Sequence, residues 1–387
     1  MFPISVAGGN LIAFLLIFLW VISGSFKNKI IHIIKNKFVL ASLLFFLLHL
    51  LSLSWADDVN LGLGSVKKML EFGVLIPALT FLFEKKRVEI YLNYFLVSVF
   101  ITVVISFLVF FGMPNPFIND SDVLNPVAFS SHVTQGPIVA IGYYVSMRFL
   151  LFLNSEQFKA KKTMVLFYVF LSLLSAANVF ILEGRAGYVV FFIVNLILFI
   201  QRFNLTYKSL MLFALTAVIF LTLVDAYSPK FHNRTIETIE SAKNLSQDRL
   251  SSLGRRYTMA ENTLNVFKEN PLVGVGSGNL PIHYEKSIKS SKIDSETLKV
   301  ISKNTKNPHN MYLLTAAELG VLGLFFLLHL FYRNLTLGLR TVNKLKKDIA
   351  VTSCVIFFLM NFSESYFLGH FTTFLYAFLA SLSLSKD

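Results

Sequence analysis

Cysteine is almost absent from this chain, and tryptophan and acidic residues are scarce. Its 387 residues include one Cys, two Trp and 22 Asp and Glu against 35 Lys and Arg. The single Cys354 excludes an internal disulfide and argues against a cysteine-based metal site. The chain also lacks the alternating segments of about ten residues that build a membrane β-barrel. Disulfide scaffolds, thiolate metal centres and barrels are therefore excluded or disfavoured.

The common catalytic motifs are missing as well. The sequence contains no phosphate-binding loop of the Walker type, no His-Glu-x-x-His pair and no Gly-x-Ser-x-Gly elbow. The run Gly274–Gly278 does not follow a strand, so it predicts a turn and not a dinucleotide site. Outward-facing aspartates such as Asp57 and Asp122 have no spacing that specifies a metal. We therefore expect no cofactor and no metal.

Long apolar runs dominate what is present. The chain is 55% hydrophobic with 41 Phe, and runs of about 17–25 residues recur, the length needed to cross a bilayer as a helix. The sequence predicts an all-α, polytopic integral membrane protein, with no cleavable signal peptide. Eleven spans are expected, at 4–25, 38–54, 65–83, 88–112, 134–153, 163–182, 186–201, 209–226, 310–332, 348–363 and 366–384.

Basic residues mark one side of the membrane. The short loops on that side and the tail hold nineteen Lys and Arg, whereas the opposite short loops hold only Lys67, Lys68 and Arg185. The positive-inside rule makes the basic loops cytoplasmic. The formal charge of +13 is then a topological signal, and no nucleic-acid partner is expected. Since Met1–Asn10 is too short to cross, the N-terminus is expected outside.

One long polar loop interrupts the spans, from Ala226 to His309, and faces outward. It divides the chain into an N-terminal bundle at 1–226, the loop at 227–309 and C-terminal spans at 310–387. The loop holds 13 of the 35 basic residues, so an anionic ligand is expected. Apolar residues spaced by three and four predict an amphipathic helix from Ser246, its N-cap, to Lys268. The predicted apolar stripe is Leu250, Leu253, Tyr257, Ala260, Leu264 and Phe267.

Three basic side chains of the loop are candidate site residues. His309 is expected at the outer start of a span, capped by Asn307, where free N–H groups and the helix dipole favour an anion and a neutral imidazole that acts as a base. Gly320 and Gly323, in line with His309, predict close helix packing. Arg256 falls about 70° from the centre of the predicted stripe and Arg255 nearly opposite. Capping and solvated faces are the alternative readings.

Further candidates lie in the short outward loops. Arg185 sits in Leu182-Glu183-Gly184-Arg185-Ala186-Gly187, where the glycines leave room for a ligand headgroup; the alternative is an arginine that snorkels to the interface. Lys67 and Lys68 are candidate ligand contacts, although Lys67 is also spaced to pair with Glu71. Glu364 is either the partner of an arginine or a loop charge. His370 and Glu318 are expected to be structural.

Two segments together resemble the O-antigen ligase and polymerase family of envelope proteins. The first runs from Arg256-Tyr257-Thr258-Met259-Ala260 to Glu269-Asn270-Pro271-Leu272-Val273-Gly274-Val275-Gly276-Ser277-Gly278-Asn279, and the second is His309-Asn310-Met311-Tyr312-Leu313 followed by Glu318, Gly320 and Gly323. Gly184-Arg185-Ala186 is similar to a variant of the family's Ser-Arg-Gly turn. The likeness extends from about residue 40 to the end.

The resemblance implies a GT-C-like fold with about twelve spans and one large periplasmic loop in the bacterial inner membrane. The eleven spans found here then lack the family's first span. Ligases of the family move a glycan from undecaprenyl diphosphate to a sugar hydroxyl of lipid A-core, inverting the anomeric centre without a metal. His309, Arg256 and Arg185 are then expected to be catalytic. Contacts to the substrates are expected from Lys67, Lys68, Arg255, Asn310, Tyr312 and Glu364.

Two alternatives remain open. A polymerase of the same superfamily joins repeat units on the lipid carrier, and the sequence hardly separates it from a ligase; the modest length and the single large loop favour the ligase. A transporter or flippase would be expected to show discontinuous spans or charges at the bilayer midplane. Because nearly all charges sit at span ends, this reading is disfavoured.

Overall fold

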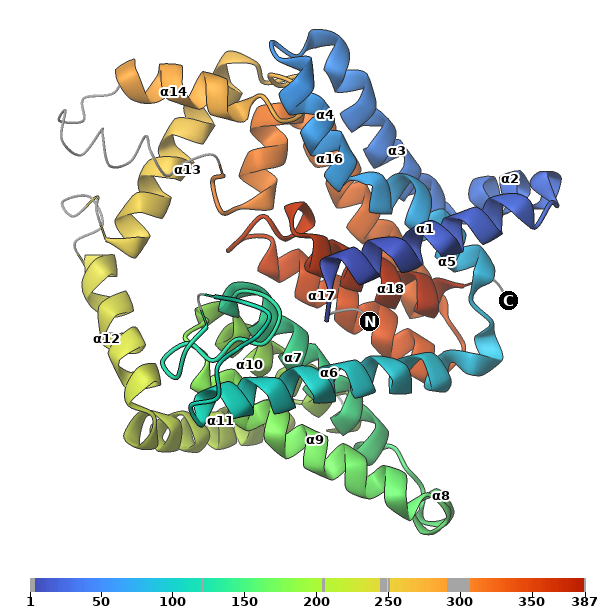
Figure 1. Ribbon diagram of the computed structural model, residues 1–387, viewed down its shortest axis with the longest axis vertical. Helices are drawn as coiled ribbons and strands as arrows, with labels where there is room; N and C mark the ends of the chain where they lie inside the picture. Colours follow the sequence, from blue (N-terminus) through green and yellow to red (C-terminus); the bar gives the residue numbers. More distant parts are fainter. Residues whose placement is uncertain are drawn as a thin grey trace. The chain divides into compact units, whose positions relative to one another are not determined.

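The computed structural model describes residues 4–119, 121–203, 206–243, 249, 251–290 and 307–385. Within these ranges all regular structure is helical (Figure 1). The chain forms two compact units that interleave in sequence, one of residues 1–12 and 86–237 and the other of residues 13–85 and 238–387. The predicted all-α polytopic architecture is confirmed. The division into three consecutive topological parts stays a prediction.

The first unit contains the helices between residues 86 and 237. α7 packs against both α9 and α10, and α6 against α7 and α9. The bounds are α6 Val88–Phe110, α7 His132–Leu151, α8 Ser155–Ala160, α9 Lys162–Ile181, α10 Arg185–Phe203, α11 Tyr207–Tyr227 and α12 Pro229–Lys243, the last of which continues into the second unit.

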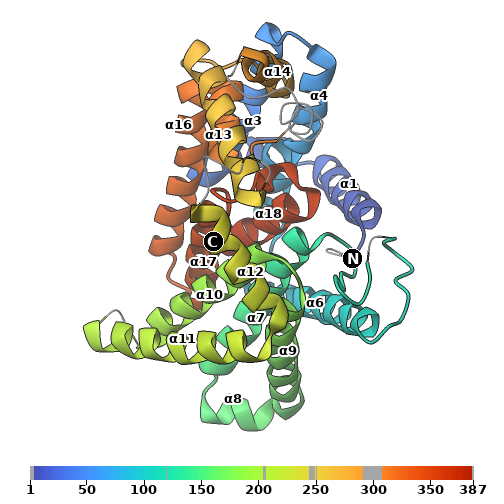
Figure 2. The same cartoon turned by 90° about the vertical axis from the view of Figure 1, so that its left-hand side faces the viewer.

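The second unit is built around α16, which packs on α3, α13 and α17. Its helices are α2 Phe26–Lys35, α3 Lys37–Leu51, η1 Ser52–Trp55, α4 Val59–Lys68, η2 Glu71–Leu75, α5 Ile76–Leu82, α13 Ser252–Glu269, α14 Leu280–Ser290, α16 Met311–Arg340, α17 Lys344–Met360, η4 Tyr366–Leu368 and α18 His370–Leu384. α16 lies beside α13 (Figure 2). Phenylalanine fills the core around the buried Tyr376, whose ring touches those of Phe72, Phe357 and Phe367.

The number of membrane-crossing helices differs from the eleven expected. Among the described residues, six helices are long and apolar enough to cross a membrane, or seven if a bent pair counts as one span. That pair is α1 (Val6–Ile22) and α2, which meet at 114°. The expected span 65–83 is broken into α4, the π-helical η2 and α5. α18 is apolar but, with 15 residues, shorter than the expected span 366–384, whereas α17 has 17 residues and matches the length of the expected span 348–363.

The glycine-rich segment after α13 closes a break in α16. Gly320 has φ 67° and ψ −160°, which interrupts the helix. The N–H groups of Val275 and Gly276 donate to the freed carbonyls of Ala317 and Glu318 at 3.0 and 2.8 Å. In return, the freed N–H of Val321 donates to the Pro271 carbonyl at 2.8 Å. A broken helix in lipid needs such partners for its backbone.

Close backbone approach explains the glycines at this crossing. A Cβ at Gly320 would lie 2.2 Å from the Leu272 carbonyl oxygen, and a Cβ at Gly274 would lie 2.3 Å from the Glu318 carbonyl carbon. Gly320 therefore meets the loop, whereas the small-residue pattern had predicted a neighbouring helix; that interpretation is wrong here. The prediction that Gly274–Gly278 forms a turn is confirmed.

Two buried side chains fasten the same loop to the helices beside it. The Ser277 hydroxyl lies 2.8 Å from His49 Nδ1 on α3, and the Ser277 N–H donates to the Ser52 hydroxyl at 3.0 Å. Asn279 accepts from the Asp58 N–H at 2.7 Å and donates to the Asp58 carbonyl at 3.1 Å. These contacts hold together the end of α13, the break in α16 and the start of α4.

Candidate active site

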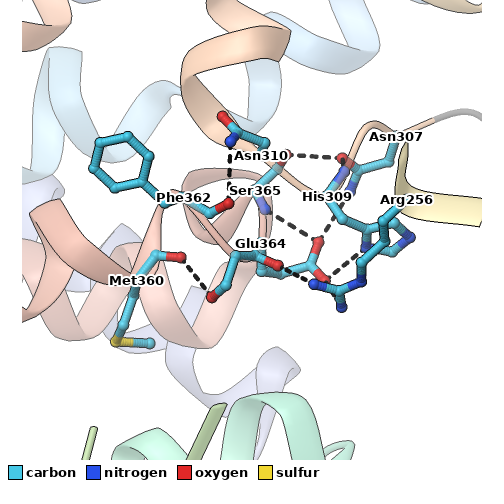
Figure 3. A network of polar contacts seen from close by, with 9 residues as sticks. Arg256, Asn307, His309, Asn310, Met360, Phe362, Glu364 and Ser365 are labelled. Atoms are coloured by element: carbon cyan, nitrogen blue, oxygen red, sulfur yellow. Dashed lines mark hydrogen bonds and ion pairs between the residues drawn. The ribbon is translucent and has the colours of Figure 1, made fainter. Parts of the chain in front are cut away.

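Glu364 is the centre of a polar network in the second unit, in the turn between α17 and η4. His309 Nδ1 lies 2.6 Å from Glu364 Oε2, and Arg256 Nη2 lies 4.0 Å from the same oxygen. The other oxygen accepts from the Ser365 N–H at 3.0 Å and from the Asn307 amide at 3.4 Å. Figure 3 shows the guanidinium and the imidazole converging on one carboxylate. Three sequence-distant segments therefore form one site.

A turn stabilised by side chains holds His309 in place. Its φ of 50° lies in the left-handed region, which residues other than glycine rarely adopt. The His309 N–H donates to Asn307 Oδ1 at 3.0 Å, and the same oxygen accepts from the Ser365 hydroxyl at 2.8 Å. Strained backbone that its surroundings enforce is typical of functional sites.

The start of α16 differs from the prediction. The N-cap is Asn310, whose side chain accepts from the Leu313 N–H at 3.0 Å, and not Asn307. The Met311 N–H donates to the Asn361 carbonyl at 2.8 Å. Two of the first N–H groups of the helix are therefore already bonded. The prediction of free N–H donors beside His309 is therefore wrong for these two groups.

Arg256 reaches the turn of Glu364 from α13. Its Nη1 donates to the Ser363 carbonyl at 2.6 Å, while 40% of its side chain stays exposed. One side of the guanidinium is thus held by the protein and the rest faces open space. Because arginine stays protonated and presents several N–H donors in one plane, such a side chain can bind phosphate oxygens.

The orientation of α13 differs from the predicted apolar stripe. Tyr257 and Leu264 are 41% and 40% exposed. The buried positions are Gly254, Thr258, Met259, Asn262, Thr263 and Val266. Arg255 precedes Met259 by four residues, so it lies on the buried side and is half-buried; the expectation that it points into solvent is wrong. The helix N-cap is Ser251, since α13 begins at Ser252, while Ser246 lies outside the described residues.

Glu364 is held in its ionised form. Burial opposes ionisation, but the hydrogen bond from His309, the positive charge of that ring when it is protonated, the Ser365 N–H and the Arg256 charge together lower the pKa of Glu364 below its usual value. A separation of 2.6 Å between an ionised carboxylate and Nδ1 requires a proton between them. The proton of a neutral ring then sits on Nδ1, and Nε2 carries the lone pair that can accept another.

Asn310 and Tyr312 join α16 to the end of α17. The Asn310 amide donates to the Phe362 carbonyl at 3.0 Å, and the Tyr312 hydroxyl donates to the Phe358 carbonyl at 2.7 Å. The Tyr312 ring also packs on Phe362 with centroids 4.4 Å apart. Both residues therefore position the segments that carry His309 and Glu364. Their contact with a substrate stays a prediction.

Lys67 and Lys68 lie exposed in the last turn of α4. Within the described ranges, no ion pair joins Lys67 to Glu71; instead His370 Nδ1 lies 3.4 Å from Glu71 Oε1. The local explanation for Lys67 is therefore wrong. His370 and Glu318 were expected to be structural, and both contact the protein itself. His370 lies beside the Glu71 carboxylate, and the N–H groups of Gly278 and Leu280 donate to the Glu318 carboxylate.

Arg185 belongs to the first unit, where it begins α10. Its Nη2 lies 3.1 Å from Glu237 Oε1 on α12. Arg234 bridges the two acidic groups nearby, with 2.8 Å to Glu237 and 2.9 Å to Glu183. The hydrogen bond from Arg234 is the main cause that lowers the pKa of Glu237; burial opposes it, and the charges of Arg185 and Arg234 add to the lowering. The convergence of Arg185 with His309 and Arg256 stays a prediction.

The glycines beside Arg185 serve helix packing. A Cβ at Gly184 would lie 2.8 Å from the His132 carbonyl oxygen, and a Cβ at Gly187 would lie 3.0 Å from Gly136 Cα. α7 therefore occupies the space that the sequence reading had assigned to a ligand headgroup. That interpretation is wrong, whereas the position of Arg185 at a helix start near the end of a short loop is as expected.

Sequence reasoning missed several members of both networks. Asn307 was assigned to a helix cap, and Ser365 and the Ser363 carbonyl carried no signal because their roles depend on a turn formed by tertiary contacts. Arg234 and Glu237 are spaced by three on α12, a pattern that would have indicated a helical ion pair. In the described part of the chain, no three His, Cys, Asp or Glu side chains gather to hold a metal ion; the prediction of metal independence is untested.

Residues 170–328 match the family model described as O-antigen ligase, which supports the family predicted from the two motifs. The matched region contains Arg185, Arg256 and His309, whereas Glu364 lies beyond it. A Haemophilus influenzae protein described as uncharacterized is 26% identical over 272 residues, which cover 66% of this chain and 65% of that protein.

Proposed function

We propose that this chain, assigned to the O-antigen ligase family by the match over residues 170–328, is a glycosyltransferase that uses a lipid-linked glycan as donor. The donor is a glycan on undecaprenyl diphosphate, and the acceptor is a sugar hydroxyl of lipid A-core. Transfer takes place at the periplasmic face of the bacterial inner membrane. The observation that carries the proposal is the convergence of Arg256 and His309 on Glu364.

The chemistry follows from the orientation of the imidazole. Glu364 holds the Nδ1 proton of His309, so Nε2 accepts the proton of the acceptor hydroxyl as its oxygen attacks the anomeric carbon. The bond from that carbon to the diphosphate oxygen breaks, and the diphosphate leaves with the bonding electrons. Attack from the face opposite the leaving group inverts the anomeric centre.

Arg256 supports departure of the diphosphate. Fixed positive charge that meets developing negative charge lowers the barrier, by roughly 3–4 kcal/mol for one well-placed donor. The guanidinium is anchored through the Ser363 carbonyl, so little reorganisation accompanies the reaction. Arg185 is proposed as the second cation on the diphosphate, with Lys67, Lys68 and Arg255 as further contacts to the anionic substrates.

The test is transfer by purified protein from undecaprenyl-diphosphate-linked glycan to lipid A-core, with and without chelator. His309→Ala and Arg256→Ala are expected to lower the rate by at least about 100-fold. Lys268→Ala is the matched control, because it removes a basic and exposed side chain from the same helix as Arg256. Product formation by His309→Ala at near the wild-type rate contradicts the role of His309.

The second candidate is the polymerase reaction, in which the acceptor is another repeat unit on the same lipid carrier. The same histidine and arginine would serve it, because the leaving diphosphate is identical. Replacing lipid A-core by a carrier-linked repeat unit in the assay separates the two. Deletion of the gene separates them in cells, since loss of a ligase leaves long polymer on the carrier and loss of a polymerase leaves single repeats.

A further inference from the structure

A basic cavity lies at the other end of α16 from His309. It has a volume of about 490 Å³ and lies in the second unit, where α2 meets α3, α16 meets α17, and α18 ends. Its lining includes four Lys and Arg side chains, Lys35, Lys37, Arg340 and Lys346, and no Asp or Glu. Cavities of this size are typical of small-ligand sites.

One of the four lining cations is buried, and the other three are exposed. Lys346 is only 2% exposed, and its ammonium donates to the Ser385 carbonyl and hydroxyl at 3.2 Å each. Lys35, Lys37 and Arg340 are exposed. Across the residues that the structure describes, no carboxylate forms an ion pair with any of these three. The cavity therefore concentrates positive charge that an anionic group would offset.

The surroundings of the cavity indicate a lipid and not a soluble anion. α2, which ends at Lys35, exposes apolar side chains: Phe26, Ile30 and Ile34 are 62%, 58% and 58% exposed, whereas Lys29 and His32 are buried. These three residues are spaced by four, so they form one apolar face. A short amphipathic helix with an exposed apolar face is suited to lie in the membrane interface.

We propose that this cavity binds the headgroup of an anionic phospholipid, with its phosphate among Lys346, Lys35, Lys37 and Arg340 and its acyl chains along the apolar face of α2. Basic pockets between helices on the side of the positive loops recognise such headgroups. The site is separate from the transfer site and does not depend on the reaction. The bound lipid holds the junction of α2 with α3 and that of α16 with α17 at the membrane.

The experiment measures lipid retained by the purified full chain, by native mass spectrometry and titration in detergent. The probes are dioleoyl phosphatidylglycerol, dioleoyl phosphatidylcholine and free glycerol phosphate. Wild-type protein is expected to bind phosphatidylglycerol at least about tenfold more tightly than phosphatidylcholine. The combined variant Lys35→Gln, Lys37→Gln and Arg340→Gln is expected to lose that preference.

The matched control removes the same charge from exposed lysines outside the cavity, as Lys27→Gln, Lys86→Gln and Lys347→Gln. It is expected to keep the preference within about twofold. Equal loss in both variants would show nonspecific attraction and overturn the site. Equal binding of the two lipids would overturn it as well. Tight binding of glycerol phosphate alone would show that the cavity takes a soluble anion.

Both variants change exposed side chains, so they are expected to fold, which thermal unfolding in detergent verifies. Arg340→Gln alone provides a second, milder variant and is expected to weaken phosphatidylglycerol binding by about fivefold, since one basic side chain near the surface contributes about 1 kcal/mol to lipid binding. Unchanged binding in this variant and in the combined variant would overturn the proposal.

Discussion

Replacing Glu364 by glutamine tests the network at its centre. The change keeps the size of the side chain but removes its negative charge. A glutamine can donate as well as accept, so it no longer requires the proton on His309 Nδ1. If the amide donates to Nδ1, the ring proton moves to Nε2 and the atom assigned to the acceptor hydroxyl loses its lone pair. The attraction between this side chain and Arg256 also disappears.

The expected magnitude follows from the contacts that change. Hydrogen bonds to charged groups contribute about 1.5–3 kcal/mol, and the bond from His309 at 2.6 Å is the one most affected. The pair with Arg256 at 4.0 Å adds less, because Arg256 is 40% exposed and solvent screens it. A cost of about 1.5–3 kcal/mol in the transition state lowers the rate by about 10–150-fold.

The assay is transfer by purified protein over a range of donor concentrations, with Glu269→Gln as the control, which changes an exposed carboxylate at the end of α13. The loss is expected in kcat and not in donor KM, since Glu364 acts through His309. Activity of Glu364→Gln within twofold of the wild type would refute the orientation of His309 by this carboxylate.

The pH dependence of thermal stability should also report the ionisation of Glu364. The pKa of Glu364 is lowered in the folded protein, so its contribution is present above the ordinary glutamate pKa, near 4.3, and is lost as pH falls through the lowered value. Wild type and Glu364→Gln should therefore differ in thermal unfolding at pH 7 and converge in strong acid. A difference that persists at the lowest pH would contradict this.

Three further substitutions test the contact of the glycine-rich loop with its neighbouring helices and the role of Arg185 in the first unit. Gly320→Ala should lower the free energy of unfolding by more than about 2 kcal/mol, because a Cβ there meets the Leu272 carbonyl at 2.2 Å in a left-handed backbone; Gly64→Ala, with open space around it, is the control. Ser277→Ala should cost about 1–3 kcal/mol in thermal unfolding, since it leaves buried His49 Nδ1 without this partner. Arg185→Lys should raise the donor KM about tenfold, because lysine lacks the planar fork, and an unchanged KM would exclude Arg185 from the donor site.

What the sequence predicted well was carried by strong local patterns. The apolar runs predicted an all-α membrane protein, and the run Gly274–Gly278 predicted a turn. Both follow from backbone chemistry that depends little on the rest of the chain. The two motifs around Arg256 and His309 predicted the family, which the match over residues 170–328 supports.

What failed depended on tertiary contacts. The face of α13 was assigned from apolar side chains, yet the buried face carries Thr258, Asn262 and Thr263, and Tyr257 is exposed. Two of these polar side chains bond within the helix: the Thr258 hydroxyl donates to the Gly254 carbonyl and the Asn262 amide to the Thr258 carbonyl. Similarly, the break in α16 required a loop more than forty residues away in sequence to complete its backbone pairing.

The position of Glu364 between Arg256 and His309 resolves a conflict in the proposed chemistry. A guanidinium that neutralises a leaving diphosphate disfavours a second positive charge nearby, yet a base becomes cationic when it accepts a proton. An ionised carboxylate 2.6 Å from the imidazole and 4.0 Å from the guanidinium offsets one of the two charges. The histidine can then act as a base beside a cation. Removing Arg256 and Glu364 together should therefore cost less than the sum of the two single losses, and strict additivity in this double-mutant cycle would contradict the coupling.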